Sequence, residues 1–167
     1  KTYSSIERLM EADSGVYLAP LRLLALEIQD KLNSQNIPCS LLTGEEEDII
    51  PYASHVSSTI EKLQIGTFYD VCVIDEAQMV SDEERGHSWT RAILGVRAKE
   101  IHVCMSPAAE KVITHLIEVC QDTFEIHRYE RKTALLCEKE AFEFPDDVQE
   151  GDALIVFTKR AVLDIAG

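Results

Sequence analysis

Short apolar runs alternate with segments of helical periodicity along most of this chain. The runs with the length and composition of strands lie at residues 15–19, 38–43, 54–59, 69–75, 100–105 and 123–130. Most of them are apolar at successive positions, which is typical of strands covered on both faces. Helical segments separate them. The pattern therefore predicts an α/β fold with a mostly parallel sheet and helices on both faces.

The helices are predicted from periodicity and from signals at their ends. They are expected at residues 20–36, 60–63, 81–96 and 107–120. Pro20 suits the first turn of the first helix. Ser81, followed by acids, suits the N-cap of the third helix, which should end at Gly95. Residues 44–52 are expected to form a charged loop.

The alternation stops near residue 131. Residues 132–150 are polar, contain Pro145 and show no period, so they are expected to be a linker. Residues 151–167 have the pattern of a new strand and helix. A single strand–helix unit cannot bury its own faces, so it either joins the first sheet or begins a second domain. We favour the second domain, with residues 1–131 as the first.

Composition narrows the class of protein. The chain has 167 residues, a formal net charge of −14 and five cysteines without a C-x-x-C pair. The cysteines favour a reducing compartment over a zinc or disulfide framework. No apolar run approaches the roughly 20 residues that span a bilayer, and the N-terminus lacks a signal-peptide core. The acidic charge argues against a free-standing nucleic-acid binder, so any bound nucleic acid needs a few local contacts.

Two adjacent carboxylates, Asp75 and Glu76, follow the most apolar strand. An acidic turn there is common without any function, because turns favour Asp and helix starts favour acids. The alternative is a nucleotide-hydrolysing site, because ligands of open parallel sheets bind beyond the carboxyl ends of the strands. One acid would then hold Mg²⁺ and the other would orient or deprotonate the attacking water.

The start of the chain supports the nucleotide alternative. Lys1 and Thr2 match the last two residues of the phosphate-binding motif G-x-x-x-x-G-K-[ST], and a helical pattern follows them. The rest of that motif would precede Lys1, so the domain is expected to be truncated at its P-loop.

A family resemblance rests on stretches that occur in the expected order. They are APLRLLALE (19–27), PCSLLTGEE (38–46), VIDEAQM (73–79), DEERGHSWTRAILGVRAKEIHVC (82–104) and RYERKTAL (128–135). They resemble the superfamily-two RNA helicases of the mitochondrial degradosome type, the Suv-three family, which also has bacterial relatives. The resemblance implies a RecA-like P-loop NTPase domain at residues 1–131 and, from LIVFTKR (154–160), the first strand and helix of a second motor domain.

The resemblance also implies functional residues. ATP and Mg²⁺ are the implied cofactors, with Lys1 on the β/γ-phosphates and Thr2 and Asp75 on Mg²⁺. Gln78 is implied to contact the nucleotide, and Glu76 is the implied catalytic residue that activates water. The implied RNA contacts are Pro20, Leu21, Arg22, Thr43, Gly44 and Thr59.

Some of these assignments have simpler alternatives. CMSPAA (104–109) takes the place of the motif that couples ATP to RNA, but it departs from the family pattern C-G-E/D-P-A, which weakens a coupling role for Ser106. Arg22 is also explained as a solvated helix charge, and Thr59 as the cap of the next helix. Trp89 is expected to pack inside the domain.

Two other functions remain open. Thymidine kinases of the cellular type also carry a P-loop and a DEAQ-like strand end, although they usually add a zinc-binding cysteine pair. The second alternative is a catalytically inert fragment or interaction module. We expect an ATP hydrolase and RNA helicase in the parent protein and an inactive isolated chain. RNA is the expected partner, with RNA–DNA or DNA duplexes and an exoribonuclease as further partners and no membrane. The expected location is cytoplasmic, with the mitochondrial matrix as the alternative.

Overall fold

The computed structural model describes residues 2–130, 136–137 and 139–166, and the chain divides into two compact units. The first unit is Lys1–Tyr129 and the second is Glu130–Gly167.

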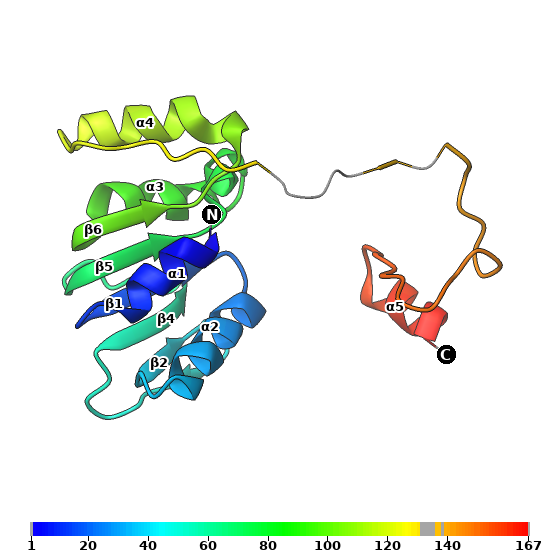
Figure 1. The fold of residues 1–167 in the computed structure, drawn as a ribbon, viewed down its shortest axis with the longest axis horizontal. Coiled ribbons are helices and arrows are strands. Elements are labelled where there is room, and N and C mark those ends of the chain that lie inside the picture. Colours follow the sequence, from blue (N-terminus) through cyan, green and yellow to red (C-terminus); the bar gives the residue numbers. More distant parts are fainter. Residues whose placement is uncertain (1, 131–135, 138, 167) are drawn as a thin grey trace. The chain divides into compact units, whose positions relative to one another are not determined.

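A six-stranded sheet forms the centre of the first unit (Figure 1). Its strands are β1 (Gly15–Ala19), β2 (Cys39–Leu42), β3 (Glu47–Asp48), β4 (His55–Thr59), β5 (Phe68–Ile74) and β6 (Arg97–Val103). Their order is β3-β2-β4-β1-β5-β6, and every neighbouring pair is parallel except β2 with the short β3. All the predicted strands up to residue 105 are therefore confirmed, and β3 lies in the predicted charged loop.

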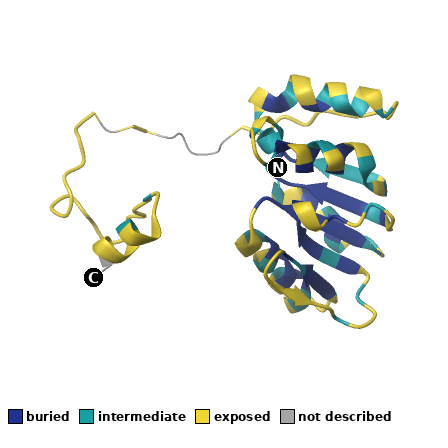
Figure 2. Ribbon diagram, turned by 180° about the vertical axis from the view of Figure 1, so that it is seen from behind, coloured by how far each residue is buried: buried dark blue, intermediate teal, exposed yellow. Residues whose placement is uncertain are grey.

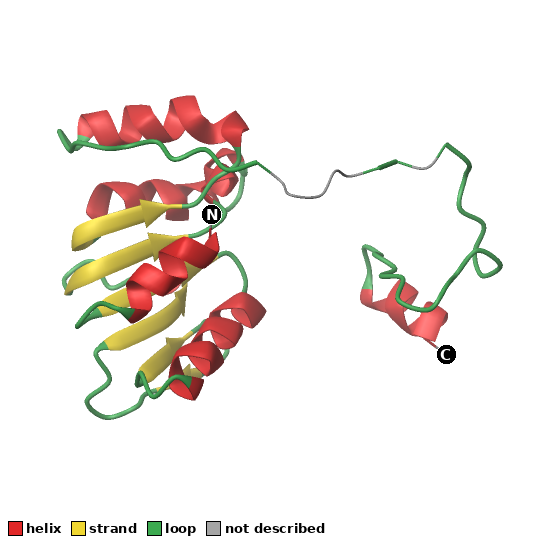
Figure 3. Ribbon diagram, viewed as in Figure 1, coloured by secondary structure: helices red, strands yellow, loops and turns green. Residues whose placement is uncertain are grey.

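Helices cover both faces of this sheet, as Figure 3 shows. They are α1 (Thr2–Met10), α2 (Arg22–Ser34), α3 (Gly86–Gly95) and α4 (Glu110–Val119), with 3-10 turns η1 (Ile60–Lys62), η2 (Ala77–Ser81) and η3 (Pro107–Ala109). In the described part of the chain, no helix is long and apolar enough to cross a membrane.

The core has two layers, one on each face of the sheet, and β1 serves both. Tyr17 and Ala19 pack with the apolar residues of α1 and α2, whereas Val16 and Leu18 pack with those of α3 and α4. This alternation follows from the two-residue period of a strand. All these side chains are at most 1% exposed, and the buried positions concentrate on the strands in Figure 2. The predicted α/β class, with a mostly parallel sheet covered on both sides, is confirmed.

The strand predicted at residues 123–130 is wrong. Those residues form no strand, and Phe124 and Ile126 are exposed. The segment returns along α4, where Arg128 Nη2 lies 2.7 Å from Glu110 Oε1 (Figure 1). Local alternation gives only a preference, because a strand also needs a neighbour for its backbone hydrogen bonds.

The third helix begins five residues later than predicted, so Ser81 is not its N-cap. Ser81 ends η2, and its hydroxyl donates to the Gln78 carbonyl at 2.9 Å. The Asp82 carboxylate instead accepts the N–H of Arg85 at 2.7 Å, building a turn before α3. Gly86 is the first residue of α3, and a larger residue does not fit there because its Cβ would lie 2.3 Å from the Val80 carbonyl oxygen.

The second unit contains the helix α5 (Lys159–Ala166). The strand predicted before it is wrong, since residues 136–137 and 139–158 contain no strand and Ile155 and Phe157 are exposed. Among the described residues of this unit, a strand there would have no neighbour with which to pair.

Candidate functional site

Asp75 lies directly after β5 and is only 5% exposed. Its N–H donates to the Leu18 carbonyl of β1 at 3.0 Å. Its Oδ2 accepts the Tyr17 hydroxyl at 2.7 Å, and its Oδ1 accepts the Thr2 hydroxyl at 3.2 Å and the Glu76 N–H at 3.0 Å. Burial, and then the charge of Asp75, raise the pKa of Tyr17, so the phenol stays protonated and donates. The carboxylate is therefore held through both of its oxygens.

Thr2 meets Asp75 although 73 positions separate them. It is the first residue of α1, whose N-terminal end carries a partial positive charge. Lys1, which was predicted to bind phosphate, lies outside the described residues. A hydroxyl and a carboxylate are hard oxygen donors of the kind that Mg²⁺ accepts. The described residues contain no cluster of three or more His, Cys, Asp or Glu suited to a metal. Mg²⁺ does not need one, because it binds through one or two carboxylates, waters and substrate phosphates.

Glu76 turns the chain away from the sheet. Its backbone is left-handed, with φ 47° and ψ 44°, which costs a non-glycine residue about 1–2 kcal/mol. The Gln78 amide donates to the Glu76 carboxylate and accepts the Ser106 N–H at 3.0 Å. Ser106 is thus joined to Glu76 through Gln78. Because Ser106 uses its backbone, its departure from the family pattern does not remove this link.

Trp89 of α3 supports the site from the face of the sheet that α3 covers. It is fully buried, and its indole N–H donates to the Asp75 carbonyl at 3.0 Å. The prediction that Trp89 packs inside the domain is confirmed, and the hydrogen bond to Asp75 is an addition to it.

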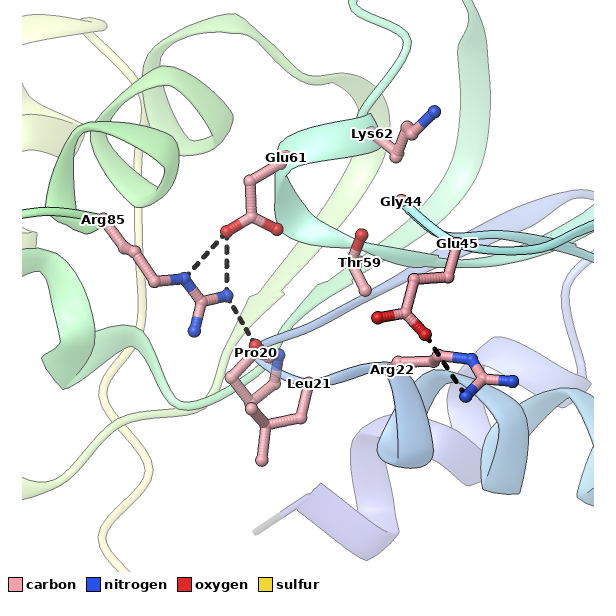
Figure 4. Close-up of a pocket in the computed structure, with 9 residues that line it drawn as sticks. All are labelled: Pro20, Leu21, Arg22, Gly44, Glu45, Thr59, Glu61, Lys62 and Arg85. Carbon is pink, nitrogen blue, oxygen red and sulfur yellow. Dashed lines mark hydrogen bonds and ion pairs between the residues drawn. The ribbon is translucent and has the colours of Figure 1, made fainter. Parts of the chain in front are cut away.

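A surface hollow of about 380 Å³ opens at the same edge of the sheet (Figure 4). The predicted RNA-contact residues that line it are Pro20, Leu21, Arg22, Gly44 and Thr59. They follow β1, β2 and β4 or end them, so the parallel arrangement brings them together. The remaining one, Thr43, is buried, and its hydroxyl donates to the Glu46 carbonyl at 2.9 Å and accepts the Glu46 N–H at 3.0 Å. Thr43 therefore shapes the turn that presents Gly44.

Neither of the helices that start at this rim, η1 and α2, has a side-chain N-cap. Thr59 occupies the N-cap position of η1, as the capping alternative predicted, but its side chain makes no capping hydrogen bond. No side chain caps α2 at Leu21 either. The first-turn N–H groups of α2 are thus not satisfied by a capping side chain.

Each cation that lines the hollow is paired with a glutamate. The pairs are Arg22–Glu46 at 2.7 Å, Arg22–Glu45 at 3.6 Å, Lys62–Glu47 at 3.3 Å and Arg85–Glu61 at 2.8 Å. The Arg22 side chain is 43% exposed, so these are surface ion pairs, and its contact with RNA stays a prediction.

Sequence reasoning missed two residues of this region. Tyr17 carried a signal, because a hydroxyl in the middle of the apolar run GVYLA needs a buried partner. Arg85 carried none, since its partners Pro20 and Glu61 are 65 and 24 positions away.

Fold and site together are typical of a nucleotide-binding α/β domain of the P-loop class. Its features are a parallel sheet, a buried acid after a central strand and a hydroxyl at the N-terminus of the adjoining helix. A family model described as the DEXQ-box helicase domain of Suv3 matches residues 1–129. The chain belongs to this family, and the Suv-three resemblance is confirmed.

Named relatives agree with the family match. The chain is 44% identical over 170 residues to the ATP-dependent RNA helicase SUPV3L1, mitochondrial, of Danio rerio, covering 99% of this chain and 22% of the relative. It is 43% identical over 166 residues to the SUV3 homolog of Caenorhabditis elegans and 41% identical over 166 residues to SUV3L of Oryza sativa, with 97% and 99% of this chain and 23% of each relative covered.

The chain thus spans between a fifth and a quarter of the length of these relatives. The matches give no support to the thymidine kinase alternative. All three relatives are named as mitochondrial, so the cytoplasmic expectation has no support from them either.

Proposed function

We propose that this chain is the first motor domain of an ATP-dependent RNA helicase, coupling ATP hydrolysis to RNA translocation or unwinding. The observation that carries the proposal is the meeting of Thr2, Asp75 and Glu76 at one edge of the sheet, beside a hollow lined by the expected RNA-contact residues. The relatives named above are ATP-dependent RNA helicases.

In the nucleotide site, Thr2 and Asp75 hold Mg²⁺ and Lys1 binds the β/γ-phosphates. When bound, Mg²⁺ offsets the negative charge of those phosphates. Tyr17 keeps the Asp75 carboxylate in place through its 2.7 Å hydrogen bond. Gln78 lies between Glu76 and Ser106 and orients the Glu76 carboxylate.

Glu76 acts as the general base. It projects from a left-handed turn next to Asp75, so its carboxylate is separate from the metal-holding one. It takes a proton from the water that attacks the γ-phosphate, a role that contributes about 10²–10⁴ to a rate.

In the hollow, RNA is held by its backbone. The uncapped start of α2 offers N–H groups to a phosphate. Arg22 adds a charged contact, and Pro20, Leu21, Gly44 and Thr59 shape the surface on which the RNA lies.

For the full-length protein, we propose residues 1–131 as the first motor domain, 132–150 as a linker and 151–167 as the start of the second motor domain. RNA–DNA or DNA duplexes as further substrates and an exoribonuclease partner follow from the family alone. The mitochondrial matrix is the proposed location, because the relatives are named as mitochondrial.

Replacing Glu76 by Gln tests the assignment, because it keeps the shape and removes the base. In the full-length protein, ATP binding should persist while RNA-stimulated hydrolysis falls by about 10²–10⁴. Glu83→Gln, at an exposed position of the same segment, is the matched control and should hydrolyse ATP like the parent. Turnover within a few-fold of the parent excludes Glu76 as the base. A parent without RNA-stimulated hydrolysis refutes the proposed function.

A further inference from the structure

Arg85 joins the loops that form the hollow. Its Nη2 donates to the Pro20 carbonyl at 2.6 Å, and its Nε and Nη2 donate to Glu61 Oε1 at 3.0 and 2.8 Å (Figure 4). Pro20 precedes α2 and Glu61 lies in η1, so one guanidinium holds two separate parts of the proposed RNA surface. Its planar fork allows these donations at once.

The Arg85 side chain also contacts Trp89, which is hydrogen-bonded to Asp75 of the proposed nucleotide site. The Arg85 guanidinium carbon lies 5.5 Å from the centre of the Trp89 ring. Trp89 is fully buried and donates to the Asp75 carbonyl at 3.0 Å. A continuous series of contacts therefore runs from Pro20 through Arg85 and Trp89 to Asp75.

A simpler role for Arg85 is to fasten α3 to its surroundings. Arg91, which lies within α3, already does this, since its Nη2 donates to the Leu63 carbonyl at 3.0 Å. Half-exposed ion pairs such as Arg85–Glu61 contribute only about 0–1 kcal/mol to stability. What distinguishes Arg85 from Arg91 is therefore its position between the two proposed binding sites.

We infer that Arg85 is a positioning residue that couples nucleotide binding at Asp75 to RNA binding in the hollow, acting through Trp89 and Pro20. The inference rests on the proposed function and identifies the residue that links its two binding sites. A ligand that shifts the Asp75 backbone moves Trp89, and Arg85 passes this movement to the turn that carries Arg22. Coupling between two binding sites is reciprocal, so RNA must affect nucleotide affinity by the same factor.

The conservative variant Arg85→Lys distinguishes an effect of the positive charge from an effect of the guanidinium geometry. Arg85→Lys keeps a positive charge but has no planar fork, so it cannot hold Pro20 and Glu61 together and stack on Trp89. Arg85→Ala removes all these contacts. Both variants should lose coupling if geometry matters, whereas a charge effect would spare the lysine variant.

The coupling factor is the decisive measurement. In the full-length protein, the dissociation constant of a fluorescent single-stranded oligouridylate is measured with and without a non-hydrolysable ATP analogue. We expect a ratio of about 5–150 for the parent, a ratio near one for Arg85→Ala and Arg85→Lys, and the parent ratio for Arg91→Ala. A purely structural role would weaken both affinities and leave their ratio intact.

The other outcomes are also decisive. An unchanged ratio in Arg85→Ala, or an equal loss in Arg91→Ala, overturns the inference. Failure of both Arg85 variants to fold, seen by circular dichroism, overturns it in favour of a structural role. A parent that binds neither the RNA nor the analogue refutes the proposed function as well. A parent that binds both without coupling refutes only the inference.

Discussion

Replacing Tyr17 by Phe removes a single hydroxyl from the Asp75 carboxylate. Tyr17 is 1% exposed, and its hydroxyl lies 2.7 Å from Asp75 Oδ2. Asp75 is itself 5% exposed, so water cannot readily replace the lost donor. The phenyl ring remains and keeps the packing of β1 against α1 and α2. The change therefore isolates one hydrogen bond to a buried charge.

The size of the effect follows from that geometry. A hydrogen bond to a charged group contributes about 1.5–3 kcal/mol to the free energy of unfolding. The unit Lys1–Tyr129 should unfold with an entropy of about 0.27 kcal/mol/K, from about 2.1 cal/mol/K per residue. Dividing the lost free energy by this unfolding entropy predicts that Tyr17→Phe lowers the melting temperature by about 6–11 °C.

Thermal unfolding of the 167-residue chain, followed by circular dichroism, checks this value. Tyr69→Phe is the matched control, because Tyr69 is 5% exposed and the side chain near its hydroxyl is the neutral Thr67. A neutral hydrogen bond contributes about 0.5–1.5 kcal/mol, so the control should lose less. In an Asp75→Asn background, the cost of Tyr17→Phe should fall to that of the control. Equal losses in both single variants would refute the reasoning that the Tyr17 bond is charge-assisted.

Two further changes test the hollow and a buried histidine. Arg22→Ala should weaken RNA binding in the full-length protein and leave RNA-independent ATP binding intact, because Arg22 lines the hollow. Titration with fluorescent RNA checks this against Arg97→Ala, an exposed control in β6, and unchanged affinity contradicts it. His55→Gln should remove a pH-dependent part of the stability. Burial lowers the pKa of His55, whose unfolded value is about 6.5, so its contribution is complete above that pH. This stability contribution of His55 decreases as the pH falls below about 6.5, by at most about 1.4 kcal/mol per pH unit. Urea unfolding of parent and variant at about pH 7.5 and about pH 5.5 measures this, and parallel losses contradict it.

Hydrophobic patterning predicted the central strands of the sheet correctly, but it predicted strands at residues 123–130 and 154–157 that do not form. Runs such as 15–19 and 69–75 became adjacent strands because each is apolar on both faces and finds a parallel neighbour. Residues 123–130 and 154–157 have comparable local patterns but no neighbouring strand in the described chain. A strand is a property of a pair, so the sequence of one segment cannot decide it.

The candidate site was predictable where chemistry is local and unpredictable where it depends on distant contacts. Asp75 and Glu76 were visible because acids interrupt an apolar run, and Thr2 because a motif precedes a helix. The 3.2 Å contact between Thr2 and Asp75 needed the fold. The role of Arg85 could not be predicted, because it contacts Pro20 and Glu61 in two distant segments, and only the strand order brings these segments together.

The net charge of −14 is compatible with a proposed RNA surface on this domain. Because each cation of the hollow is paired with a glutamate, the hollow carries no large positive excess. A phosphate that approaches Arg22 must displace the Glu46 carboxylate, and this exchange is cheap because exposed pairs contribute about 0–1 kcal/mol. The gain from each exchange is correspondingly small, so attraction must also come from backbone N–H groups at the uncapped start of α2. Such donors act only where a phosphate fits the rim. We therefore expect an acidic domain with paired cations to bind RNA only where a phosphate fits these donors, and not by its overall charge.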